Sequence, residues 1–176
     1  MSLNSNFAAD DFRYSIIFTR VGFYKGHLCA IKKFETCKIE LTRHVKKELK
    51  NLRDLKHDNI NQFIGACVEP NRICIVSDYC TRGSLKDILN NEEIKLDHMF
   101  VSSLVFDIVR GMIYLHDSPT GFHGDLKPTN CLVDSRWVLK LTDFGQQIFN
   151  HEWPDLLDIV CRPKVDEEIC ENLLYR

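Results

Sequence analysis

Two stretches of the chain carry apolar residues at helical spacing. The first predicts a helix over about 41–55, whose apolar stripe consists of Leu41, Val45, Leu49, Leu52 and Leu55. The second predicts a longer helix over 97–117, which Asp97 could cap and whose core stripe consists of Phe100, Leu104, Ile108, Met112 and Leu115. Between them, Ser84 and Asp87 form a capping-box-like pair that indicates the start of another helix.

Strand-like runs fill much of the remaining chain. Aromatic and branched residues over 14–34, broken by Gly22 and by Lys-Gly-His at 25–27, predict a strand pair that turns at Gly26. Segments 63–68 and 73–77 predict further strands, separated by the turn sequence Glu-Pro-Asn-Arg at 69–72. Two short strands, 131–133 and 138–142, are joined by Asp-Ser-Arg at 134–136. We therefore expect an α+β fold, with a small lobe of about five antiparallel strands and a helix, followed by a mainly helical part.

Composition is that of an ordinary soluble globular domain. The 176 residues are 44% hydrophobic and 27% charged, which suits one domain with a substantial core. The formal net charge of -2 gives no basic field for nucleic acid. No uninterrupted apolar run is long enough to cross a bilayer, and the start lacks the pattern of a secretory signal.

Eight cysteines are scattered along the chain without a Cys-x-x-Cys pair. We expect them to be reduced, cytosolic and mostly buried. A zinc site built from His151, Cys161 and Cys170 has suitable ligand types, but the spacing fits no structural zinc pattern.

Candidate chemistry is concentrated in His-Gly-Asp-Leu-Lys-Pro-Thr-Asn at 123–130 and Thr-Asp-Phe-Gly at 142–145. Asp125 could accept a proton from a hydroxyl, and Lys127 could neutralise a transferring phosphoryl group. Asn130 and Asp143 offer hard oxygen ligands of the kind that Mg²⁺ prefers. Because the intervening hairpin folds back, it should carry Asp143 beside Asn130. The simpler interpretation is that these Asp and Asn residues only make turns.

The two segments resemble the catalytic loop and the metal-binding loop of protein kinases, with Gly124 where most kinases have arginine. The amino-acid sequence of 123–145, together with those of 60–67, 73–80 and 82–89, is most similar to the kinase-homology domain of receptor guanylyl cyclases. This resemblance covers roughly 18–145. It implies a two-lobed kinase-like fold, with an N-terminal extension over 1–13, a small lobe and hinge over 14–80, and a partial helical lobe over 81–176.

The resemblance also implies an ATP site. Lys32, in the strand sequence Ala-Ile-Lys, would contact phosphates, and Glu48 on the first helix could pair with it. Backbone amide and carbonyl groups of Asp78 and Cys80 would contact an adenine edge, with Ser77 at the entrance to the pocket behind the adenine. ATP and Mg²⁺ are thus the implied cofactors. Considered alone, a strand lysine and a helix glutamate are usually solvated.

The sequence also departs from the kinase pattern. Residues 10–19 contain no glycine, so the loop that covers nucleotide phosphates in kinases is missing. Gly124 replaces an arginine that pairs with a phosphorylated segment in many kinases, and 146–174 contain no serine, threonine or tyrosine. The ending Leu-Leu-Tyr-Arg resembles the residues just before the kinase Ala-Pro-Glu, so we expect a domain truncated before that region.

The leading hypothesis is an ATP-binding regulatory domain with no or very weak protein kinase activity, from a receptor guanylate cyclase that makes cGMP from GTP. Its implied partners are ATP, an adjoining coiled coil and cyclase domain, and a second copy in a homodimeric parent. The implied location is the cytoplasmic side of the plasma membrane, as a soluble segment of a single-span receptor. One alternative is a pseudokinase scaffold that binds no nucleotide. The other is an active Ser/Thr or Tyr protein kinase, favoured by the presence of Lys32, Glu48, Asp125, Lys127, Asn130 and Asp143.

Overall fold

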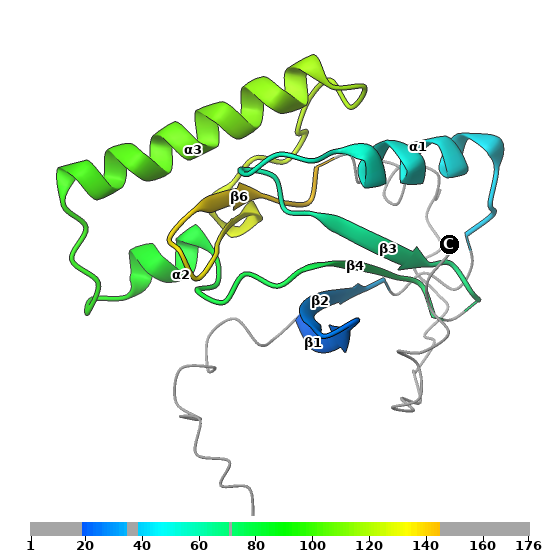
Figure 1. Ribbon diagram of the computed structural model, residues 1–176, viewed down its shortest axis with the longest axis horizontal. Helices are drawn as coiled ribbons and strands as arrows, with labels where there is room; N and C mark the ends of the chain where they lie inside the picture. The colour runs from blue at the N-terminus through cyan, green and yellow to red at the C-terminus, as the bar shows by residue number, and fades with distance from the viewer. Residues whose placement is uncertain (1–18, 35–38, 71, 145–176) are drawn as a thin grey trace, which may run out of the picture.

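The computed structural model describes residues 19–34, 39–70 and 72–144, which form an α+β fold (Figure 1). A sheet and one helix come first, and two further helices and a small hairpin follow. The strands are β1 (Thr19–Tyr24), β2 (His27–Lys33), β3 (Phe63–Cys67), β4 (Cys74–Asp78), β5 (Cys131–Val133) and β6 (Leu139–Leu141). The helices are α1 (Arg43–Asp54), α2 (Leu85–Asn90) and α3 (His98–Asp117), and a single 3₁₀ turn spans Pro128–Asn130.

Strands β1 to β4 form one antiparallel sheet in the order β1-β2-β4-β3. The turn between β1 and β2 has positive φ at both central residues, Lys25 (48°) and Gly26 (82°), which matches the twist of the flanking strands. The predicted strand pair turning at Gly26 is confirmed from Thr19 onward. The described part of the chain contributes four strands to this sheet, whereas about five were predicted. Positions 14–18, where the first predicted strand begins, lie outside the described residues.

Helix α1 begins two residues later than the apolar stripe suggested. The Thr42 hydroxyl caps it by accepting a hydrogen bond from the Val45 amide at 3.2 Å, which leaves Leu41 outside the helix. Val45 and Leu52 are buried, and Leu49 packs with Ala66 and Ile75 against one face of the sheet. The predicted stripe is therefore the face that α1 buries.

Both later helices begin at the predicted caps. Ser84 and Asp87 form a reciprocal capping box at the start of α2. The Asp97 carboxylate accepts from the Phe100 amide at 2.7 Å and starts the 20-residue α3.

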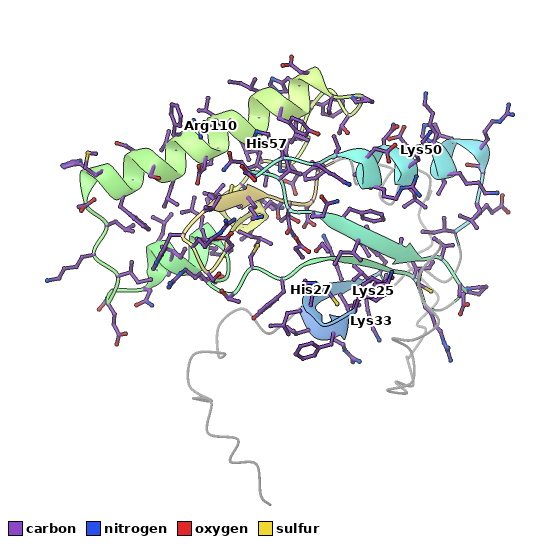
Figure 2. The ribbon with its side chains drawn as sticks, viewed as in Figure 1. Lys25, His27, Lys33, Lys50, His57 and Arg110 are labelled. Atoms are coloured by element: carbon purple, nitrogen blue, oxygen red, sulfur yellow. The ribbon has the colours of Figure 1, made fainter. Side chains whose placement is uncertain are left out.

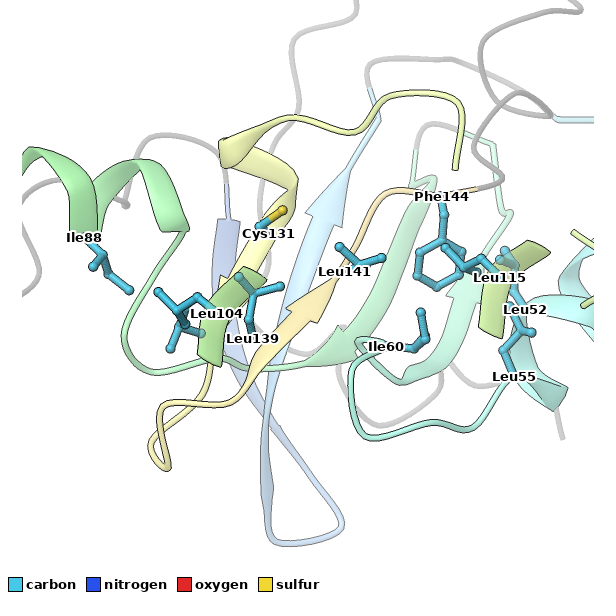
Figure 3. Packing of buried hydrophobic residues seen from close by; sticks show 11 residues of the cluster. Leu52, Leu55, Ile60, Ile88, Leu104, Leu115, Cys131, Leu139, Leu141 and Phe144 are labelled. Carbon is cyan, nitrogen blue, oxygen red and sulfur yellow. The ribbon is translucent and has the colours of Figure 1, made fainter. Parts of the chain in front are cut away.

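The largest core cluster joins these helices to the small hairpin (Figure 3). Leu104 and Leu115 of α3 are buried in it, together with Leu139 and Leu141 of β6 and Phe144 beyond β6. Phe100, Ile108 and Met112 pack against the same cluster, which confirms the predicted stripe along α3.

Gly111 lets α3 approach the hairpin closely. A Cβ atom at this position would lie 2.8 Å from the backbone oxygen of Asn59 and 2.9 Å from Cδ1 of Leu141. These distances are shorter than ordinary van der Waals contact, so a side chain at position 111 would push α3 away from β6.

The loop before β3 ties the sheet to the hairpin. The Asn61 amide donates to the Leu141 oxygen at 2.8 Å, and the Leu141 amide donates to the Asn59 oxygen at 2.9 Å. The buried Asn59 side chain adds a third hydrogen bond, to the Leu139 oxygen at 3.0 Å. Residues 59–61 therefore join the two parts of the molecule as an extra strand-like partner of β6.

Within the described residues, α3 has the length and apolar composition that would allow a helix to cross a membrane. The sequence contains no long uninterrupted apolar run, because Asp107 and Arg110 interrupt the apolar residues of α3. One side of α3 nevertheless packs on β6 as part of the protein core.

The described cysteines support the prediction of reduced, buried thiols. Buried cysteines are found at positions 29, 67, 74, 80 and 131. The candidate zinc ligands His151, Cys161 and Cys170 lie outside the described residues.

Candidate functional site

Two side chains 111 residues apart meet at the centre of the predicted site. The ammonium of Lys32, on β2, lies 2.7 Å from Oδ2 of Asp143, in the loop after β6. Asp143 adopts a left-handed backbone conformation (φ 62°), which costs about 1 kcal/mol or more and is held by its surroundings. The fold thus brings together two predicted site residues, the strand lysine and the loop carboxylate, although the sequence analysis had paired Lys32 with Glu48.

The catalytic-loop residues form a second, adjoining group. Nζ of Lys127 lies 2.6 Å from Oδ2 of Asp125, and Nδ2 of Asn130 donates to Oδ2 of Asp125 at 3.0 Å and to its backbone oxygen at 2.8 Å. The hydrogen bond from Lys127 holds the pKa of the exposed Asp125 carboxyl below its ordinary value. Asp125 is therefore ionised near neutral pH and able to accept a proton or a hydrogen bond.

The metal loop is held beside this group. The Thr142 amide donates to the Asn130 backbone oxygen at 3.0 Å, so the hairpin does bring Asp143 next to Asn130 as predicted. Because the Asn130 amide nitrogen is committed to Asp125, its side-chain oxygen is the group left for a cation.

Asn130 and Asp143 suit a Mg²⁺ ion whose other ligands are phosphate oxygens and water. No cluster of three or more His, Cys, Asp or Glu suited to a metal occurs in the described ranges. Magnesium is commonly held by one or two protein oxygens together with substrate phosphates and water, which is what Asn130 and Asp143 offer.

Glu48 does not take the predicted place. It is half-buried on α1, and among the described residues no ion pair joins it to Lys32, whose carboxylate partner is Asp143. Position 48 lies at the edge of the face through which α1 packs, about 60° from Val45 and about 40° from Leu52 around the helix, and Lys32 nevertheless contacts Asp143. The expected Lys32–Glu48 pair is therefore replaced by the Lys32–Asp143 pair in this structure.

The hinge residues are also partly engaged within the protein. The Asp78 amide donates to the Gln62 oxygen at 3.0 Å, and the Cys80 oxygen accepts from the Gly83 amide at 3.3 Å. The Asp78 amide is thus not available to an adenine edge. The Cys80 amide donates to no acceptor within the described part of the chain, so it is able to donate to a ligand.

Asn61 is a residue that the sequence analysis missed. It is buried behind the hinge, where Nδ2 donates to the Ser77 hydroxyl at 3.3 Å and Oδ1 accepts from the Cys80 thiol at 3.8 Å. Burial raises the pKa of the Cys80 thiol to about 12, so it remains a donor. A polar residue between the apolar Ile60 and Phe63 was the signal that could have indicated this role.

Three apolar residues on β1, β2 and β5 were not singled out by the sequence analysis. Val21 and Ala30 are register partners on β1 and β2, and Ala30 shares the face of β2 that carries Lys32, two residues further on. In β5, Leu132 points away from the core that its neighbours Cys131 and Val133 enter. Two-residue alternation along these strands would have indicated them.

The buried His123 ring contacts the backbone of the catalytic loop and the side chain of Phe144. The His123 ring accepts from the Asp125 amide at Nδ1 (3.3 Å) and meets the edge of Phe144, with ring centroids 6.1 Å apart. Burial lowers the pKa of His123, and its Nε2 lacks a hydrogen-bond partner among the described residues. A neutral imidazole therefore fills this position.

Other predictions stay untested by the described residues. The glycine-free segment 10–18 and the hydroxyl-free segment 146–174 lie outside them, and the boundaries 1–13, 14–80 and 81–176 remain predictions.

Comparison with known proteins places this arrangement in a family. The sequence profile of the protein kinase domain matches residues 13–161. The resact receptor of Arbacia punctulata is 49% identical over 143 residues, which are 81% of this chain and 14% of that receptor. Atrial natriuretic peptide receptor 2 of Anguilla japonica is 55% identical over 133 residues, covering 76% of this chain and 13% of the relative. Guanylate cyclase 32E of Drosophila melanogaster is 50% identical over 128 residues, covering 73% and 11%.

The chain spans only 11–14% of the length of these relatives. Its match to the kinase profile covers most of its residues, and the sheet, helices and catalytic hairpin agree with a kinase-like fold. The resemblance inferred from the motifs is confirmed: this chain belongs to the protein kinase domain family and, within it, to the kinase-homology domains of receptor guanylyl cyclases.

Proposed function

We propose that this chain is a regulatory domain that binds ATP with Mg²⁺ in a receptor guanylate cyclase. The observation that carries the proposal is the contact between Lys32 and Asp143 at 2.7 Å. The Lys32 ammonium suits phosphate oxygens and the Asp143 carboxylate suits magnesium. The two groups lie side by side, as binding of a nucleotide phosphate together with its Mg²⁺ ion requires.

The surrounding residues suit a bound nucleotide. Lys32 would contact phosphate oxygens, and Asp143 with Asn130 would hold the ion, which screens the phosphate charge when bound. The Cys80 amide would donate to the adenine edge, while Val21 and Ala30 above and Leu132 below would cover the ring faces. Asn61 would fix the hinge through Ser77 and Cys80.

A regulatory role is favoured over phosphoryl transfer. Transfer depends on orienting the γ-phosphate and stabilising its charge, and the glycine-free segment 10–19 gives up backbone contacts that a retained aspartate does not replace. We therefore expect nucleotide occupancy to bias an attached cyclase, with little or no protein phosphorylation.

The proposed setting follows from the relatives. Their names describe receptors and a guanylate cyclase. We propose that the parent protein is a homodimeric single-span receptor, with this domain on the cytoplasmic side of the plasma membrane, joined to a coiled coil and a cyclase domain that makes cGMP from GTP.

Nucleotide binding by the full-length protein tests the proposal. Calorimetry with ATP and Mg²⁺ should give weak binding that is reduced at least tenfold by Lys32→Met or Asp143→Ala, since a charge-assisted contact contributes about 1.5–3 kcal/mol. Lys33→Met is the matched control, because Lys33 neighbours Lys32 but points to the opposite face of β2. Equal affinity in all variants would refute the assignment.

An active protein kinase remains the second candidate, because Asp125, Lys127 and Asn130 are held in contact. Transfer of labelled phosphate to generic protein substrates distinguishes the two. Robust transfer by the wild type that disappears in Asp125→Ala would make the kinase assignment the better one. Absence of both transfer and nucleotide binding would favour a scaffold.

A further inference from the structure

The β1–β2 hairpin has a charge balance unlike the rest of the chain. The whole chain has a formal net charge of -2, yet residues 19–34 contain no aspartate or glutamate. Their positive charges are Arg20, Lys25, Lys32 and Lys33. This hairpin is therefore a local basic surface on a slightly acidic protein.

Most of these cations are available to a partner. Lys32 pairs with Asp143, whereas Arg20, Lys25 and Lys33 are exposed and form no ion pair with the described residues. Lys25 sits at the turn, with its ammonium 5.2 Å from the centre of the Tyr24 ring. Its charge thus lies beside an aromatic side chain at the hairpin tip.

Large apolar side chains are exposed at the same tip. Phe23 is 70% exposed and Leu28 is 40% exposed, and they are direct register partners across the two strands. They form one apolar pair one position behind the Tyr24–His27 pair that flanks the turn. Phe23 and Leu28 therefore place apolar surface directly beside the Lys25 ammonium at the turn.

The hairpin also lies apart from the main core. Strands β1 and β2 are at the edge of the molecule away from α3 (Figure 1), and Lys25, His27 and Lys33 are all on that side, whereas Lys50 is on α1 (Figure 2). The tip can therefore meet a surface without rearrangement of the α3–β6 core.

We propose that the tip of the β1–β2 hairpin, formed by Phe23, Lys25 and Leu28, binds an anionic lipid bilayer. Apolar side chains enter the boundary between headgroups and acyl chains, while neighbouring cations remain at the level of the lipid phosphates. A nucleic acid or an acidic peptide would satisfy the cations but would leave the Phe23–Leu28 pair without an apolar environment.

This contact goes beyond nucleotide binding and does not depend on it. Arg20 and Lys33 lie five or more strand residues behind the turn, roughly 16 Å or more, which exceeds a Debye length, so Lys25 is the cation that acts at the headgroups. The contact would set the orientation of the domain at the membrane surface.

Co-sedimentation with vesicles tests the proposal in the absence of nucleotide. The chain should bind vesicles of phosphatidylcholine mixed with phosphatidylserine and should bind pure phosphatidylcholine vesicles much more weakly. Lys25→Gln should lower binding about fivefold, the contribution of one cation near an anionic surface. Lys50→Gln removes the same charge from α1 and should leave binding nearly unchanged. Equal losses in the two variants, or equal binding to both vesicle types, would overturn the proposal.

A spectroscopic measurement keeps the test independent of charge. Phe23→Trp should give blue-shifted emission when phosphatidylserine vesicles are added, because the indole enters an apolar layer. Phe106→Trp is the control at an exposed position on α3. A blue shift at position 106 without one at position 23 would assign the lipid contact to α3 and refute the hairpin site.

Discussion

Replacing Gly111 with alanine should destabilise the protein, although alanine is the better helix former. The substitution gains about 1 kcal/mol from helix propensity. Against this, the new Cβ would lie 2.8 Å from the Asn59 oxygen and 2.9 Å from Cδ1 of Leu141. Overpacking of this kind costs about 1–3 kcal/mol. Disturbing the hydrogen bond from the Leu141 amide to Asn59 costs about 1 kcal/mol more.

The net expected change is a loss of about 1–3 kcal/mol in the free energy of unfolding. Urea denaturation, followed by the fluorescence of Trp137 in a Trp153→Phe background, measures it. Trp137 reports on α3 because it packs edge-to-face on Phe100 at 5.0 Å between ring centroids. With a denaturant slope of about 2 kcal/mol/M, the midpoint should fall by roughly 0.5–1.5 M.

Ser103→Ala is the matched control for Gly111→Ala. Ser103 is exposed on α3, so its replacement should leave the midpoint unchanged or raise it slightly. A midpoint that rises in both variants would show that helix propensity decides the outcome and that α3 does not approach Asn59 and Leu141 so closely.

Three further predictions concern other parts of the molecule. The exposed apolar face of α3 should make the chain self-associate with rising concentration, and Phe106→Ser with Val109→Ser should shift sedimentation toward monomer; unchanged association would rule out this face. Asn61→Leu should weaken ATP binding at least fivefold in calorimetry, since it leaves Ser77 and Cys80 without their shared partner, and wild-type affinity would refute that role. The pKa of His123 is below its ordinary 6.5 in the folded state, so the unfolded state binds more protons and the free energy of unfolding should fall as the pH drops through 6.5. In melting experiments at a series of pH values, His123→Phe should flatten this dependence. An unchanged dependence of melting temperature on pH would contradict the prediction.

Much of the local structure could be predicted because local signals agreed. The apolar stripe along α3 coincides with the predicted cap at Asp97, the stripe along α1 is confirmed from Val45 onward, and Lys25-Gly26 suits the turn between β1 and β2. In each of these places, periodicity and backbone preference point to the same element. The approach of Asp143 to Asn130 was predictable for a similar reason, because a short hairpin leaves few ways for its ends to lie.

The partner of Lys32 could not be predicted from spacing. Glu48 and Asp143 are both plausible partners in sequence, and the choice depends on how α1 and the β5–β6 hairpin sit on the sheet. The same holds for Asn61, whose role arises only when the loop over 59–61 pairs with β6 and turns the carboxamide toward Ser77. Long-range packing decides such contacts.

The buried cysteines allow the local opening of the two parts of the molecule to be followed separately, through the rates at which their thiols are alkylated. Cys29, Cys67 and Cys74 lie in the cluster on the sheet, whereas Cys131 lies in the core shared with α3. Burial raises the pKa of the Cys67 and Cys131 thiols, so alkylation must wait for local opening that exposes the sulfur and lets it ionise. The order in which these thiols become modified therefore records which part of the domain opens first, without any change to the sequence.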